Sequence, residues 1–246
     1  MFDQISAWFA GLKADFILNF VAENRWQYLT SGLGTTLSLT LLSTILGIIL
    51  GVVVAIVRSS HDKLRDDNRG GIGRKILGFF NAVCKVYLTV IRGTPVIVQL
   101  LIIYYVILAS SNNKLLVGVI AFGVNSGAYV AEIVRSGIMS IDNGQFEAGR
   151  SLGFNYVQTM WYVIIPQAFK NVLPALANEF IVLLKETSVC GYIAMQDITK
   201  GAYIIIGRTY SPFMPLIAVA LIYLVLVMFF TWLVGKLERR LRNSDH

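Results

Sequence analysis

The chain has 246 residues, of which 56% are hydrophobic and only 14% are charged, and its mean hydropathy is +0.66. An apolar share this high exceeds that of a soluble globular domain, so the composition predicts an integral membrane protein in contact with lipid. The formal net charge of +7 comes from basic residues that gather in loops beside apolar runs, which indicates membrane orientation and excludes nucleic acid as the expected partner.

The first 28 residues carry apolar side chains at helical spacing with charged residues between them, at Phe2, Ile5, Phe9, Leu12, Phe16 and Phe20. This pattern predicts that residues 1–28 form an external amphipathic helix on the membrane surface, with a flexible leader as the alternative. Residues 33–57 are uncharged and long enough to cross the bilayer, so they are the first predicted span. Gly47 and Gly51 have the G-x-x-x-G spacing that lets another helix approach closely.

Four more apolar segments are predicted to be spans, the first of them with a kink at Pro95: residues 79–109, 115–135, 173–191 and 212–234. Basic residues are frequent in the 58–75 loop and in the tail, which places both in the cytosol. The expected fold is an all-α integral membrane protein with five transmembrane helices, its N-terminus outside and its C-terminus in the cytosol. Residues 29–242 form the membrane domain, and residues 136–171 are a cytosolic loop within it.

The cytosolic loop contains a polar, helix-forming stretch at residues 145–166, QFEAGRSLGFNYVQTMWYVIIP, between two long apolar segments. Glu147 and Ala148 lie in a short first helix, and Gly153 permits a turn after it. Pro166 is expected to end a second helix, because proline cannot continue one. Two short helices joined by a turn would form a knob that is presented to a partner.

The stretch resembles the EAA loop of ABC importer permeases through Glu147-Ala148-Gly149, Gly153 and Ile165-Pro166. It departs from the commonest pattern at Gly149, Val163 and Ile165, each by a small or aliphatic exchange. Two further stretches are similar to the polar amino acid uptake subfamily: Arg92-Gly93-Thr94-Pro95 with Gln99, and residues 125–137. The resemblance runs from about Gly32 to the tail.

This resemblance implies a type I importer in a bacterial cell membrane, with a dimeric pore of two identical or similar permease chains. In that family two cytosolic ATPases lie below the pore, and an external amino acid-binding protein delivers substrate. This sequence has no P-loop and no binding-protein domain, so both partners are expected to be separate chains. ATP and Mg²⁺ would bind the ATPase, no cofactor is expected on this chain, and the chain is expected to be a transporter subunit, not an enzyme.

The resemblance also implies which residues contact the ATPase, namely Glu147, Ala148, Gly149, Arg150, Gly153, Phe154 and Pro166. In that family the loop is a coupling helix that docks into a groove of the ATPase. Arg150 and Phe154 would present charge and a hydrophobic plug to this groove, and Glu147 is favoured near the start of its helix by the helix dipole. The alternative is an ordinary amphipathic cytosolic helix.

Ionisable and polar residues within predicted spans are candidates for substrate contact, because charge inside a bilayer is costly. Lys185 and Glu186 lie a little past the middle of the fourth span and point about 100° apart, so one can meet substrate while the other pairs elsewhere. Glu186 is expected to contact a cationic substrate group, with pairing to Arg92 or Lys185 as the alternative. Arg92 and Gln99 are expected to share a helix face.

For two of these candidates the sequence favours a structural role over direct contact with substrate. Arg92 either binds the substrate carboxylate or anchors carbonyl groups at the Pro95 break, and Asn125 either hydrogen-bonds across the pore or serves packing. The buried Glu186 predicts a basic amino acid as substrate, such as arginine, lysine or histidine, and glutamine or another polar amino acid is the alternative. Other classes left open are an ion-gradient-driven secondary transporter and a membrane scaffold. Cys84 and Cys190 both lie in apolar segments, and no metal site is expected.

Overall fold

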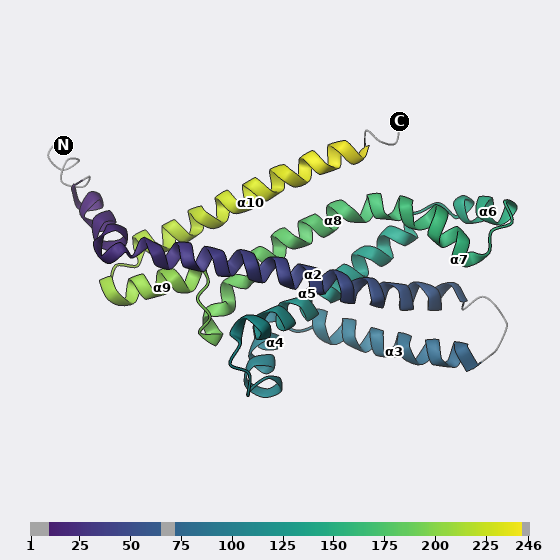
Figure 1. Cartoon of the computed structure of the whole chain (residues 1–246), viewed down its shortest axis with the longest axis horizontal. Helices are drawn as coiled ribbons and strands as arrows, with labels where there is room; N and C mark the ends of the chain where they lie inside the picture. The colour runs from purple at the N-terminus through teal and green to yellow at the C-terminus, as the bar shows by residue number, and fades with distance from the viewer. Residues whose placement is uncertain (1–9, 65–71, 243–246) are drawn as a thin grey trace.

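The computed structural model describes residues 10–64 and 72–242, and these residues form helices with no strand among them (Figure 1). The α-helices are α2 (Trp26–Leu64), α3 (Ile72–Arg92), α4 (Val96–Ile102), α5 (Lys114–Met139), α6 (Asn143–Ser151), α7 (Tyr156–Thr159), α8 (Ile165–Glu186), α9 (Ile198–Thr209) and α10 (Phe213–Arg242). Shorter π or 3₁₀ segments are η1 (Ile17–Val21), η2 (Ala22–Asn24), η3 (Ile103–Ile107), η4 (Met160–Ile164) and η5 (Thr187–Ile193). The all-α class is confirmed. Residues 1–9 of the predicted amphipathic helix and residues 65–71 of the predicted basic loop lie outside the described residues.

Within the described part of the chain, three helices are long and apolar enough to cross a membrane, namely α2, α5 and α10. The pair formed by α3 and the α4–η3 segment passes the same test together, but it bends by 108° at its break. The predicted kink at Pro95 is therefore a full break in the helix. α8, which contains most of the predicted fourth span, does not meet the test, so the number of five spans stays a prediction.

α2 packs along α5, and glycines make this close approach possible. A Cβ atom at Gly51 would lie 2.5 Å from Cγ1 of Val130, and one at Gly47 would lie 2.9 Å from Oγ of Ser126. Gly123 of α5 likewise packs closely on Leu46 of α2, because a Cβ atom at Gly123 would lie 2.6 Å from Cδ2 of Leu46. The expectation that Gly47 and Gly51 allow close helix contact is confirmed.

Gly51→Ala is expected to destabilise the protein by about 1–3 kcal/mol, because the new methyl group would overlap Val130 and force α2 and α5 apart. Gly34→Ala is the matched control, since it lies on the same helix and a Cβ there would meet no atom within 4 Å. Thermal unfolding of both variants in detergent, followed by tryptophan fluorescence, measures the difference. Equal melting temperatures for the two variants would contradict the expectation.

The N-terminal segment, residues 10–24, and the stretch of residues 145–166, called the coupling stretch below, lie at opposite ends of the molecule (Figure 1). At one end, the buried Asn19 donates to Oγ of Ser211 at 3.1 Å and accepts from Oγ1 of Thr209 at 2.9 Å. These bonds hold the segment against the turn between α9 and α10. At the other end lie α6 and α7, and α10 runs towards that end. This arrangement agrees with an N-terminus on the side opposite to the coupling loop.

Candidate translocation and coupling sites

The helix is broken between Arg92 and Val96, and the Gln99 side chain caps carbonyl groups at this break. Nε2 of Gln99 donates to the carbonyl oxygen of Ile91 at 2.7 Å, to that of Thr94 at 3.0 Å, and lies 2.9 Å from the Thr94 hydroxyl. Broken helices inside a membrane protein need such partners, because lipid offers none for free carbonyl groups. Gln99 therefore satisfies the end of α3 from the first turns of α4.

Asn125 completes this arrangement from α5. Its Nδ2 donates to Oε1 of Gln99 at 3.0 Å, and only 2% of the residue is exposed. Both ends of the Gln99 amide are thus engaged within the protein. The expectation that Gln99 shares a helix face with Arg92 is wrong, because α3 ends at Arg92 and the chain turns sharply before Gln99.

Arg92 faces α5 rather than the carbonyl groups at the break. Its guanidinium lies 3.9 Å from Oε2 of Glu132 and 5.7 Å from the ring centre of Tyr129. The other carboxylate oxygen of Glu132 accepts from Arg135 at 2.8 Å. Glu132 therefore links the end of α3 to the last turns of α5, a contact that the sequence pattern did not reveal because Arg92 and Glu132 belong to different predicted spans.

Two carboxylates lie on one side of α8. Glu179 is buried and accepts from Oγ of Ser126 at 2.9 Å, whereas Glu186 is half-buried two helical turns further on. Among the described residues Glu186 forms no hydrogen bond or salt bridge, and Arg92 lies beside Glu132 instead. Lys185 interacts with Glu186 only through longer-range electrostatic attraction, so pairing between these two residues stays an alternative. Lys185 is exposed and likewise forms no hydrogen bond or salt bridge with a described residue.

The coupling stretch forms two short helices, as expected. Asp142 caps α6 by accepting from the Gly144 N–H at 2.7 Å, and Asn155 with Gln158 forms a capping box at the start of α7. Gly153 has a φ of +81° in the turn between them, a conformation that glycine adopts without strain. Gly149 is buried, and a Cβ there would lie 2.6 Å from Cγ2 of Thr159, so α6 packs against α7 through this glycine.

Pro166 does not end a helix, which corrects the expectation. Helical structure continues from α7 through η4 into α8, and Pro166 lies in the first turn of α8. Proline is tolerated there because the first N–H groups of a helix have no partner within the helix. The short π segment before Ile165 lets the chain remain helical across the junction.

The exposed surface of this stretch is partly polar and partly apolar. Glu147, Ala148 and Arg150 of α6 are exposed. Leu152 is 73% exposed directly after α6, whereas Phe154 is half-buried, with its ring centre 6.1 Å from that of Tyr162. Leu152 is thus a strongly exposed apolar side chain close to Arg150, as Val157 of α7 is at 72%. Sequence reasoning missed Leu152 because Phe154 is the larger residue in the same turn.

A family model described as the binding-protein-dependent transport system inner membrane component matches residues 71–243. The chain therefore belongs to this family of membrane-embedded transporter components. The arginine transport system permease protein ArtQ of Bacillus subtilis is 37% identical over 185 residues, which cover 69% of this chain and 84% of ArtQ. The glutamine transport system permease protein GlnP of Escherichia coli K12 is 33% identical over 177 residues, covering 70% of this chain and 81% of GlnP.

Solved structures agree with this assignment. A crystal structure of an amino acid ABC transporter with histidines matches with a TM-score of 0.78 and 41% identity, covering 90% of this chain and 98% of that chain. An inward-facing structure of the MetNI methionine ABC transporter matches with a TM-score of 0.71 at 18% identity, covering 87% of this chain and 96% of that chain, and shows the shared fold. The predicted ABC importer permease and its type I importer fold are confirmed. The chain is a transporter subunit of a bacterial membrane rather than an enzyme.

Proposed function

We propose that this chain is the permease of an ATP-driven importer for a basic amino acid, with arginine as its main substrate. The observation that carries the proposal is Glu186, a half-buried carboxylate that forms no hydrogen bond or salt bridge with a described residue and has only the exposed Lys185 as a longer-range cation. A half-buried carboxylate without a salt bridge is costly, and a cationic side chain of a substrate would compensate its charge. The likeness to ArtQ, named as an arginine permease, supports the same class of substrate.

Lys185, about 100° around α8 from Glu186, is the candidate for the substrate carboxylate, because its side chain is exposed and forms no salt bridge with a described residue. Arg92, Gln99 and Asn125 would support this site indirectly, because their polar groups already bind Glu132, the α3 end and one another. Glutamine is the second candidate substrate, since GlnP of Escherichia coli is also a relative. An unpaired carboxylate favours a cationic substrate over the neutral one.

The importer would comprise this permease with a second, identical or similar permease chain, two cytosolic ATPases that bind ATP and Mg²⁺, and an external amino acid-binding protein. The chain would cross the membrane five times, with its N-terminus outside and its C-terminus in the cytosol. The exposed α6 residues Glu147, Ala148 and Arg150, followed by Leu152, would dock into the ATPase, with Phe154 bracing the turn. Closure of the ATPases would push α6, and α8, which is continuous with α7, would transmit the movement to Glu186.

The test begins with a tagged pull-down from native membranes in mild detergent, in which an ATPase is expected at about one copy per permease. The recovered chains and the external binding protein are then reconstituted into liposomes. ATP-dependent uptake of arginine is expected to exceed that of glutamine at equal concentration. Uptake of glutamine but not arginine would identify glutamine, the second candidate, as the substrate. Arginine uptake without ATP would contradict the proposal that the importer is driven by ATP.

A further inference from the structure

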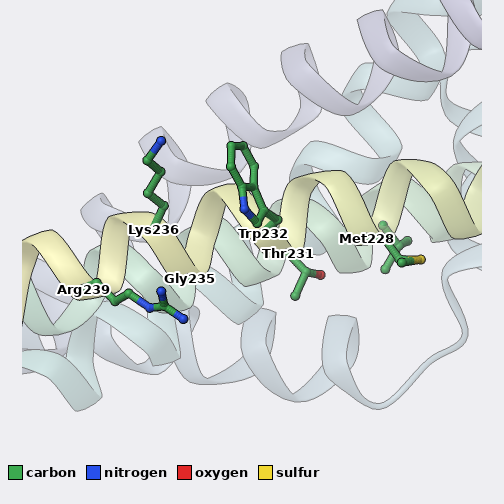
Figure 2. Close-up of a pocket in the computed structure, with 7 residues that line it drawn as sticks. Met228, Thr231, Trp232, Gly235, Lys236 and Arg239 are labelled. Carbon is green, nitrogen blue, oxygen red and sulfur yellow. The ribbon is translucent and has the colours of Figure 1, made fainter.

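The last turns of α10 carry an open groove of about 580 Å³ whose lining comes from that helix alone. The residues that matter are Met228, Thr231, Trp232, Gly235, Lys236 and Arg239 (Figure 2). Trp232 is 60% exposed, as large aromatic side chains on the outer faces of this chain commonly are. The groove therefore faces the surroundings of the protein and not its interior.

The two cations of the groove are available to an external anion. Nζ of Lys236 lies 5.0 Å from the ring centre of Trp232, and Figure 2 shows both side chains rising on the same side of the helix. Arg239 extends on the other side of Gly235. Neither cation forms an ion pair with a described residue. A Cβ at Gly235 would meet no atom within 4 Å, so the space between the cations is open.

The order of side chains along α10 follows the polarity of a membrane surface. The apolar Met228 comes first, the amphipathic Trp232 follows one turn later, and the cations Lys236 and Arg239 come last. From Met228 to Arg239 the helix rises about 16 Å, which is about the distance from the middle of a leaflet's acyl chains to beyond its headgroups. Tryptophan is typical of the interface, and basic residues beyond it attract anionic headgroups.

We propose that this groove binds an anionic phospholipid of the cytosolic leaflet. Its phosphate would lie over Gly235 between Lys236 and Arg239, its glycerol region beside Trp232, and one acyl chain along Met228 and Thr231. Charge complementarity favours this occupant over a second copy of the chain, because a packed protein interface here would bury two cations that form no ion pair with a described residue. The inference is independent of which substrate the importer carries.

The test compares lipids that co-purify with the assembled transporter, extracted from a preparation in mild detergent and quantified by mass spectrometry. Phosphatidylglycerol is expected to be enriched over phosphatidylethanolamine in the wild type. Lys236→Gln and Arg239→Gln are each expected to reduce this enrichment about fivefold. Arg240→Gln is the matched control, because it removes the same charge one position along the helix but lies outside the groove.

Three results would overturn the proposal: unchanged enrichment in the Lys236→Gln and Arg239→Gln variants, an equal loss in Arg240→Gln, or no enrichment in the wild type. A photoreactive amino acid at position 235 supplies a second measurement in otherwise wild-type protein. Its expected product is a crosslink to phosphatidylglycerol in mixed vesicles of phosphatidylglycerol and phosphatidylethanolamine. Crosslinks to a second permease chain instead would identify the groove as a protein interface and contradict lipid binding.

Discussion

Leu152→Asp is expected to abolish ATP-driven uptake while leaving the membrane fold intact. Leu152 is 73% exposed beside Arg150, so its side chain contributes little to folding but would lie within the proposed ATPase contact. Placing a charge at the apolar centre of an interface costs about 2–4 kcal/mol, which corresponds to a loss of affinity of roughly 30-fold to 1,000-fold. Co-purification of the ATPase with the tagged permease measures this loss, and uptake in liposomes measures its consequence.

Asn143→Asp is the control for this experiment. It adds the same charge at the opposite end of α6, where a helix N-terminus accepts negative charge, and it removes no apolar surface. Melting temperatures of both variants should match that of the wild type. If the ATPase still co-purified with Leu152→Asp at the wild-type ratio, the apolar contact would have to lie elsewhere on the exposed surface of α6 and α7.

Glu186→Gln is expected to weaken transport of arginine far more than transport of glutamine. Loss of one partner of a desolvated charge pair costs at least about 2 kcal/mol, so the apparent KM for arginine should rise roughly 30-fold or more. The substitution keeps the size of the side chain and removes its charge. No described residue would lose an ion pair, because Glu186 forms none in the structure, and stability should therefore not fall.

The matched control is Glu238→Gln, which removes an exposed carboxylate near the end of α10. Uptake should be measured at saturating external binding protein, so that selection by that partner is the same for every variant. An unchanged KM for arginine in Glu186→Gln would show that Glu186 does not contact the substrate. Equal losses for arginine and glutamine would show a structural role instead of recognition of charge.

Local sequence features were sufficient for the fold class and for the shape of the coupling stretch. Long apolar runs predicted membrane helices, and Gly153 predicted the turn that the structure shows with its positive φ. The Gly47 and Gly51 spacing predicted close helix contact. Each of these features depends on a few neighbouring residues, so it can be recognised without knowing the rest of the fold. The prediction that Pro166 ends a helix was wrong, because proline is found both just after a helix and in the first turn of the next one.

By itself, the sequence determined that this protein is helical, lies in a membrane and contains a loop that resembles the coupling loop of ABC importer permeases. Only the tertiary structure decided the direction of the chain after Pro95 and the partners of the buried polar groups. A proline break sets where a helix stops, but the 108° bend depends on packing against α5. Gln99 meets Asn125 across 26 residues of sequence, and Glu186 forms no salt bridge with a described residue, because such partners are brought together or kept apart only by the packing of whole helices.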